Sequence, residues 1–262
     1  MYGLIKNELY KFFKQKKLYL FIAVIVAVQL VSVWQYQSSN REQVSHLLNG
    51  QSYPLAALAE SSLFITMFMA VFIAETIVEE YKRGTFKLVL LRPVSRTQFI
   101  FAKSVSVLAC ICFMVAFTIL TAYGIGVLFL GWGNQLIVQG EPLFSDGMLL
   151  RDGKGVVLTV VAAFAYSLPV FGFAMLIMFI ALLSLNVGIT IGTALALFMF
   201  VPLLNGVIQD YSIIHIMNDF PYLAINEVTS QEFFLSIGII FVYIMVFYIG
   251  SLIFIKKKDV LL

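Results

Sequence analysis

The side chains that could carry out chemistry are few and scattered. The 262 residues include two histidines and two cysteines. Cys110 and Cys112 lie two apart in an apolar run, so on a helix they would point to different faces, which favours inert packing over a disulfide or a metal site. His46 and His215 are isolated and lack the clustered ligands of a zinc site. We therefore expect no metal and no cofactor bound by this chain.

One carboxylate, Glu60, lies inside apolar sequence. An ionisable residue within a membrane span is a functional candidate by default, although a buried hydrogen-bonded structural group or a simple span boundary is the interpretation we favour. A phosphate-binding loop is not found, because Gly147 and Gly153 are separated by five residues and neither Ser nor Thr follows Lys154. The sequence thus predicts that this chain is not itself an ATPase or another enzyme.

The most informative segment connects the second and third apolar runs. Glu79 precedes Arg83 by one helical turn, which allows an ion pair, and Gly84 is placed to end that helix. Further on, Ser95 and Gln98 match a capping box, so the next helix should begin there in a defined direction.

Between these two points, residues 85–91 should form a short amphipathic helix. Phe86, Val89 and Leu90 would share one side of it, and Pro93 would close it. Rigid turns at both ends suit a helix that contacts a partner and passes its motion to two neighbouring helices. The alternative is a basic loop whose caps serve only the topology.

The elements that carry these residues must lie in lipid. Apolar residues make up 61% of the chain and charged residues 12%, against about 45–50% and about 25% in soluble domains. So few charges cannot cover a compact soluble domain, which excludes an ordinary soluble enzyme. The 25 Phe, 6 Pro and two Cys also exclude disorder and disulfide scaffolds. A net charge of +3 does not indicate a nucleic-acid partner.

Stretches without charge mark six predicted spans. A helix needs about 20 apolar residues to cross the hydrocarbon, so the uncharged run 155–209 is too long for one helix and should break at 184–188. We therefore expect an all-α membrane protein in which residues 1–262 form a single permease domain. Its spans are predicted at about 18–36, 55–78, 99–130, 156–183, 187–204 and 233–255.

The basic residues give this arrangement a direction. Five lie in the arm 1–17, six in the segment 79–103 and three in the carboxyl-terminal tail, whereas the opposite loops hold three. Basic loops stay on the cytoplasmic side. Both termini should therefore be cytoplasmic, with the protein in the cell membrane.

The arm 1–17 itself should be helical. Ile5, Leu9, Phe12 and Phe13 recur at helical spacing, and lysines occupy the remaining surface. Such a helix would lie in the membrane plane, with its apolar face in the acyl boundary and its lysines against anionic head groups. A basic topology signal is a compatible interpretation.

Two further segments could contact other surfaces. Gly188, Gly192 and Ala196 form a row of small residues in the fifth span, which permits close approach of another helix, either within the subunit or in a permease dimer. The segment 209–232 is acidic yet rich in apolar residues. We expect it to form short helices that enter the outer leaflet, or a surface for a partner protein.

The connecting segment also resembles a known family. It reads Glu79-Glu80-x-x-x-Gly84-Thr85-x-Lys87-x-x-Leu90-x-x-Pro93-Val94-Ser95-Arg96. This pattern is similar to the segment between the second and third spans of ABC-2 type transporter permeases, particularly the six-span permeases of bacitracin and lantibiotic exporters. In that family the segment forms a coupling helix seated against a nucleotide-binding subunit. The layout of basic arm, six spans and basic tail is similar as well.

The resemblance implies a dimer of permeases, or of two related permeases, bound to two separate ATPase subunits that carry ATP and Mg. It also implies export of a peptide antibiotic or another amphipathic molecule. Glu79 and Arg96 would make polar contacts with the ATPase, and Phe86, Val89 and Leu90 would fill its apolar groove. The remaining coupling residues would be Gly84, Thr85, Pro93 and Ser95.

Two other classes of function stay open. An ion-coupled transporter or channel would need paired ionisable groups at mid-membrane, and the third to sixth predicted spans show none there. An intramembrane lipid-modifying enzyme could use Glu60 or Glu75 as acid or base, but it would need clustered His, Asp or Ser, which the spans lack.

Overall fold

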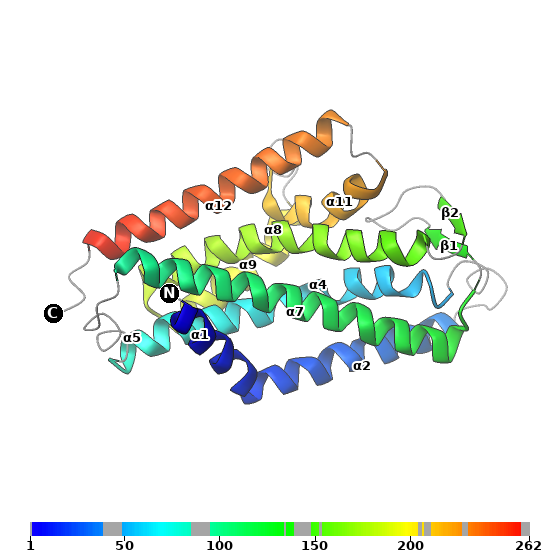
Figure 1. Ribbon diagram of the computed structural model, residues 1–262, viewed down its shortest axis with the longest axis horizontal. Helices are drawn as coiled ribbons and strands as arrows, with labels where there is room; N and C mark the ends of the chain where they lie inside the picture. Colours follow the sequence, from blue (N-terminus) through cyan, green and yellow to red (C-terminus); the bar gives the residue numbers. More distant parts are fainter. Residues whose placement is uncertain are drawn as a thin grey trace.

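The computed structural model shows a long bundle of helices (Figure 1). It describes residues 2–38, 49–84, 95–133, 135–138, 148–151, 154–203, 206, 211–226 and 230–257. Within this part of the chain, five helices are long and apolar enough to cross a membrane. They are α2 (Lys16–Ser38), α4 with its continuation (Tyr53–Lys82), α7 (Arg96–Leu130), α8 (Lys154–Ser184) and α12 (Gln231–Lys257).

The predicted spans match these helices to within a few residues. The predicted fifth span, 187–204, corresponds to α9 (Val187–Phe200) and a 3-10 turn, η2 (Val201–Leu203), which together make a shorter apolar helix. The count of six spans therefore stays a prediction. The break before α9 is confirmed: Leu185 has a φ of 46°, and the side chain of Asn186 accepts hydrogen bonds from the backbone N–H groups of Gly188 and Ile189.

Three further elements lie outside the long helices. α1 (Tyr2–Lys14) precedes α2, and α11 (Ile213–Asn226) precedes α12. Strands β1 (Gln135–Val138) and β2 (Met148–Arg151) pair antiparallel, with Gln135 opposite Arg151, as a small ribbon added to the expected helical fold.

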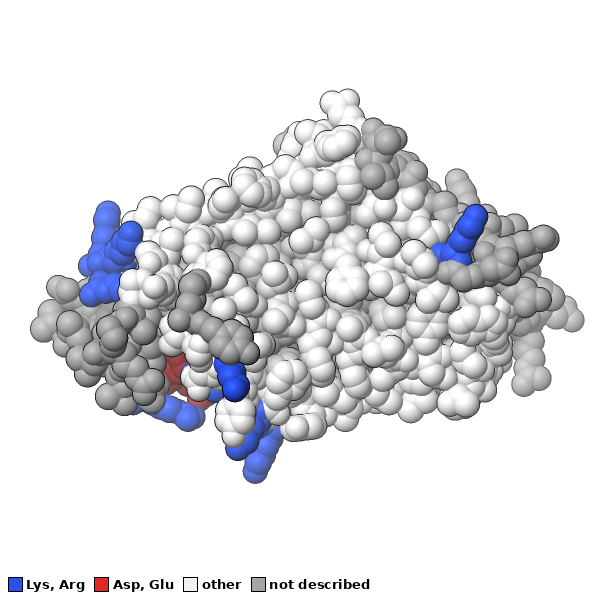
Figure 2. Space-filling view, in the orientation of Figure 1, with Lys and Arg blue, Asp and Glu red and all other residues white. Residues whose placement is uncertain are grey.

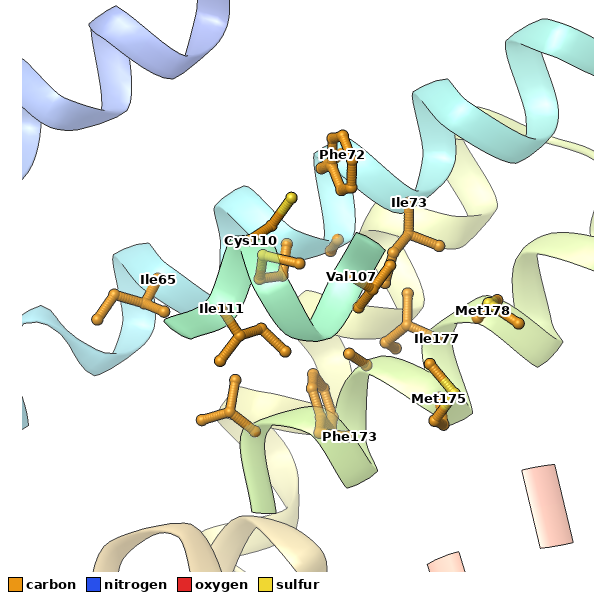
Figure 3. Close-up of a cluster of buried hydrophobic side chains, with 14 of the residues drawn as sticks. Ile65, Phe72, Ile73, Val107, Cys110, Ile111, Phe173, Met175, Ile177 and Met178 are labelled. Carbon is orange, nitrogen blue, oxygen red and sulfur yellow. The ribbon is translucent and has the colours of Figure 1, made fainter. Parts of the chain in front are cut away.

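The core forms where α4 packs between α7, α8 and α9. Ile65, Phe72 and Ile73 of α4 meet residues of α7 and α8 there (Figure 3). Cys110 is fully buried among them as one apolar side chain of many, in agreement with inert packing. Figure 3 also labels Val107, Ile111, Phe173, Met175, Ile177 and Met178 in this cluster.

The outside of the bundle is apolar as well. α12 lies along α8 and α11 (Figure 1), and 11% of its most apolar stretch is buried. Its outer face exposes Phe241, Val242, Val246 and Ile249. A surface of this kind is typical of helices that face lipid or a partner helix.

The start of α1 and the end of α12 lie toward one end of the bundle, where α5 (Glu80–Lys82) also ends (Figure 1). We call it the basic end, because Lys and Arg side chains gather there (Figure 2). The start of α8, which is Lys154, lies at the opposite end (Figure 1). The middle of the molecule shows no charged side chain on the face drawn in Figure 2. This distribution is the one from which the membrane orientation is predicted.

Candidate functional site

At the basic end, α1 docks onto the bundle. Phe12 is fully buried and makes edge-on contacts with Phe68 and Phe72 of α4 and with Phe113 of α7, at ring distances of 5.9, 5.4 and 5.7 Å. The helix itself was predicted, but the expectation that its whole apolar face enters lipid is wrong at Phe12. The aromatic pocket between α4 and α7 buries that ring, while Phe13 stays 45% exposed.

A closed ring of four charges fastens α1 beside this pocket. Lys11 donates to Glu8 at 2.8 Å and to Glu80 at 2.6 Å. Lys103 of α7 donates to the same two carboxylates, to Glu8 at 3.1 Å and to Glu80 at 2.9 Å. Each acid thus bridges both bases, and the ring joins α1, the end of the α4 continuation and α7.

Lys103 is the most enclosed member of this ring. Its side chain is 3% exposed, and its third hydrogen bond goes to the backbone carbonyl of Thr76 at 2.6 Å. An ammonium group has three donors, so all of them have acceptors here. A buried charge is tolerated only when it is paired and hydrogen-bonded in this way.

The ring favours the charged forms of its two α1 members, Glu8 and Lys11. Burial alone would raise the pKa of Glu8, but the charge of Lys103 and the hydrogen bond from Lys11 outweigh it, so the pKa lies below its usual 4.5. Burial would likewise lower the pKa of Lys11, but its hydrogen bonds to Glu8 and Glu80 raise it above 10.5. Glu8 and Lys11 are therefore both charged at neutral pH.

The path of α4 explains how Glu80 reaches the ring. A π-helical turn, η1 (Glu75–Glu79), interrupts the helix before α5. Glu75, at the start of the turn, and Glu80, just after it, both point to the side on which α1 and α2 lie. Glu75 forms an ion pair with Lys17 of α2 on that side.

A cavity of about 500 Å³ opens between α1 and this π-turn. Three acids and three bases line it, so the charges on its wall have no dominant sign. Its lining residues are Tyr10, Lys11, Lys14, Gln15, Glu75, Thr76, Glu79, Glu80 and Arg83.

The helices on both sides of the predicted coupling helix end and begin as expected. Glu79 pairs with Arg83 at 2.7 Å, as predicted, and Gly84 ends the helix with a φ of 72°. At the other flank both hydrogen bonds of the predicted capping box form. The backbone N–H of Gln98 donates to the hydroxyl of Ser95 at 3.2 Å, and the backbone N–H of Ser95 donates to Oε1 of Gln98 at 3.1 Å. Five of the predicted coupling residues lie outside the described part of the chain: Thr85, Phe86, Val89, Leu90 and Pro93.

Arg96 has a role that the sequence did not indicate. Its guanidinium donates to the backbone carbonyls of Ile255 and Lys256 at 2.9 and 3.0 Å. These carbonyls belong to the last turn of α12, where a cation is favoured by the helix dipole. Arg96 therefore ties the start of α7 to the end of α12.

The other predicted residues lie elsewhere. Glu60 accepts a hydrogen bond from the hydroxyl of Tyr36 at 2.8 Å, but the residue is exposed, so the expectation of a buried structural group is wrong. Gly188, Gly192 and Ala196 lie on an exposed face of α9, and a side chain added at Gly192 would meet nothing within 4 Å. Among the described residues this row is exposed, and both of its expected roles, packing within the subunit and in a permease dimer, stay predictions.

The apolar segment before α12 also packs on protein. Ile213, Met217 and Phe220 of α11 are buried in the contacts of this helix with α8 and α12. The predicted helix exists, but its apolar face covers the bundle. His215 pairs with Asp219 at 3.0 Å, and no metal-binding group of three His, Cys, Asp or Glu occurs among the residues described.

Sequence reasoning missed two members of the ring. Lys103 lies inside the predicted span 99–130, and it was counted only among the basic residues of the 79–103 segment. A charge inside a span is itself a signal of function, and it would have singled out this lysine. Glu8 carried no comparable signal of its contact with Lys103, because the two residues are 95 apart in sequence.

Comparison with known protein families gives a match over most of the chain. A family model described as "Protein of unknown function (DUF2705)" matches residues 20–261. No curated protein matches the chain with significant similarity. Since the model matches well over half of the sequence, the chain belongs to the DUF2705 family.

Proposed function

We propose that the chain is the membrane permease subunit of an ATP-driven ABC-2 type exporter and works with a separate ATPase. The observation that carries this proposal is the way both flanks of the segment 85–94 are anchored. On one side the charged ring ties Glu80 to α1 and α7. On the other side Arg96 ties the start of α7 to α12.

These anchors would let one contact move several helices. A force on the segment 85–94 would pass through Gly84 into α4 and through the cap at Ser95 into α7. The ring and Arg96 would extend the same displacement to α1 and α12. A coupling helix needs this mechanical connection, whereas a loop that only sets topology does not.

In the proposed cycle, ATP binding and dimerisation of two ATPase subunits shift the segment 85–94. The shift changes the exposure of a cleft between two permeases in the cell membrane, with both termini cytoplasmic. The exposed row Gly188, Gly192 and Ala196 offers a close helix contact to the second permease. The substrate class implied by the resemblance is a peptide antibiotic or another amphipathic molecule.

The direct test replaces Phe86 and Leu90 with Asp. We expect the double variant to insert into the membrane normally and to lose the ATPase that co-purifies with the wild type. Tyr211→Asp, a change at an exposed residue away from the coupling segment, is the matched control and should retain the ATPase. Unchanged co-purification and unchanged ATP hydrolysis in the double variant would rule out the coupling role.

The same preparation discriminates the rival functions. An ion-coupled transporter would move its substrate when an ion gradient is the only energy source and no ATPase is bound. A lipid-modifying enzyme would turn over lipid in the purified chain and lose that activity in Glu60→Gln or Glu75→Gln. A neighbouring reading frame with Walker motifs would favour the exporter.

A further inference from the structure

We propose that the π-turn η1 is a two-register joint and that Lys103 is the positioning residue that holds it in the π register. This inference deepens the proposed function, because the joint lies directly before the segment 85–94. Its geometry concerns the permease alone and can be tested without an ATPase.

The π-turn contains one residue more than an α-turn would need. In a continuous α-helix each residue adds about 100° of rotation and 1.5 Å of rise. Conversion of η1 to α-helix would therefore turn α5 by about 100° about its axis and advance it by about 1.5 Å. Gly84 and the segment that follows would turn with it.

Four contacts hold the turn in its present register. Glu75 pairs with Lys17, and Glu80 pairs with Lys11 at 2.6 Å and with Lys103 at 2.9 Å. The fourth contact is the hydrogen bond from Lys103 to the carbonyl of Thr76, inside the turn.

The α register would undo the ring. Glu75 and Glu80 lie on one side in the π-turn, but five residues of regular helix would place them about 140° apart. Glu80 would then leave Lys103, which is enclosed and has Glu8 as its other charged partner. The loss of a buried partner disfavours this register, so the ring selects the π form.

The surroundings leave room for the rotation. The cavity of about 500 Å³ lies on the side to which Glu75, Glu79 and Glu80 point. The one-turn continuation α5 is exposed or half-buried throughout, and none of its three residues is buried. Rotation of this short piece would move Tyr81, which packs against the core, and would require Ile77 and Val78 inside the turn to repack against α8 and α9. The buried part of α4 before the turn could keep its place.

The experiment measures distances between spin labels in the purified permease, reconstituted in lipid nanodiscs. One pair is placed at Lys82, after the turn, and Phe101 on α7, both exposed. The reference pair is placed at Glu60, before the turn, and Phe101. Cys110 and Cys112 are replaced by alanine in every sample.

Lys103→Met should add a second population to the 82–101 distances. A side-chain tip about 5–6 Å from the helix axis moves by up to about 8 Å when it turns through about 100°. The 60–101 distances should stay single. An unchanged 82–101 distribution would show that the π-turn is permanent, and a broadening of both pairs would show general loosening; either result overturns the proposal.

Two further variants test the joint without removing the buried ammonium group, in case Lys103→Met does not fold. Lys17→Gln removes only the ion pair to Glu75, at a lysine that is 56% exposed, and should produce a smaller second population at the 82–101 pair. Lys14 lines the same cavity, and Lys14→Gln should produce no second population. A second population in Lys14→Gln, or none in Lys17→Gln, contradicts the joint. A missing ATPase would defeat the proposed function without changing these distances.

Discussion

Replacement of Lys103 by Met tests the charged ring as a stabilising element. Methionine keeps a side chain of similar length but removes the ammonium group, so Glu8 and Glu80 lose one of their two bases. Removal of one partner from a buried ion pair costs about 3–5 kcal/mol, because the other charge stays buried without compensation. Lys11 still pairs with both carboxylates. We therefore expect a loss at the lower end, about 3 kcal/mol.

This loss can be measured as a shift in thermal unfolding. A destabilisation of 1 kcal/mol lowers the Tm of a domain of about 150–250 residues by about 2–4 °C, so the variant should unfold about 6–12 °C lower. Tryptophan fluorescence in nanodiscs reports the transition through Trp34 and Trp132. The exposed Lys257→Met is the matched control and should leave the Tm unchanged.

A second measurement separates the ion pair from simple loss of packing. In a double-mutant cycle of Lys103→Met and Glu80→Gln, directly contacting groups should show a coupling of about 0.5–3 kcal/mol. The double variant should therefore lose less stability than the sum of the single variants. A Tm shift below about 3 °C for Lys103→Met, or strictly additive losses, would refute the description of the ring as a buried network.

Three further predictions concern the same end of the molecule. Because the pKa of Glu8 is lowered in the folded protein, its contribution to stability is present above pH 4.5 and is lost as the pH falls through the folded value. Glu8→Gln should therefore weaken the fall of Tm at acid pH. The same fall of Tm in both proteins would exclude Glu8 as its source. Phe12→Ala should cost about 3–5 kcal/mol because it empties the aromatic pocket between α4 and α7; thermal unfolding with the exposed Phe13→Ala as control measures it, and equal losses in the two variants would contradict the docking of α1. Ser95→Ala should cost about 1 kcal/mol through loss of the α7 cap, and Ser95→Thr should restore most of it; a Tm equal to that of the wild type in Ser95→Ala would show that the cap contributes nothing.

Local features of the site could be predicted because they depend on neighbouring residues. The capping box joins Ser95 and Gln98, three residues apart, and the ion pair of Glu79 and Arg83 spans four. Gly84 ends its helix because a positive φ is easily adopted by glycine. The helix breaks at Leu185 and Asn186 follow from turn-forming residues in the same way.

The partners of α1 could not be predicted, because amphipathicity shows which side of a helix is apolar and not what covers that side. Phe12 fits a pocket of aromatic rings from two other helices. Protein atoms bury this ring as effectively as lipid would. The same ambiguity affected α11, whose apolar face also covers the bundle.

The sequence by itself determined which stretches form long apolar helices, how several of them begin and end, and that the basic residues gather at one end. These properties come from hydropathy summed over about 20 residues and from contacts within one or two turns. Only the tertiary structure decided that Glu8 and Lys103, which are 95 residues apart, share a buried ring, and that a π-turn brings Glu80 to them. The physical reason is that a buried charge is stable only beside its counter-charge, and that neighbour is chosen by how the helices pack.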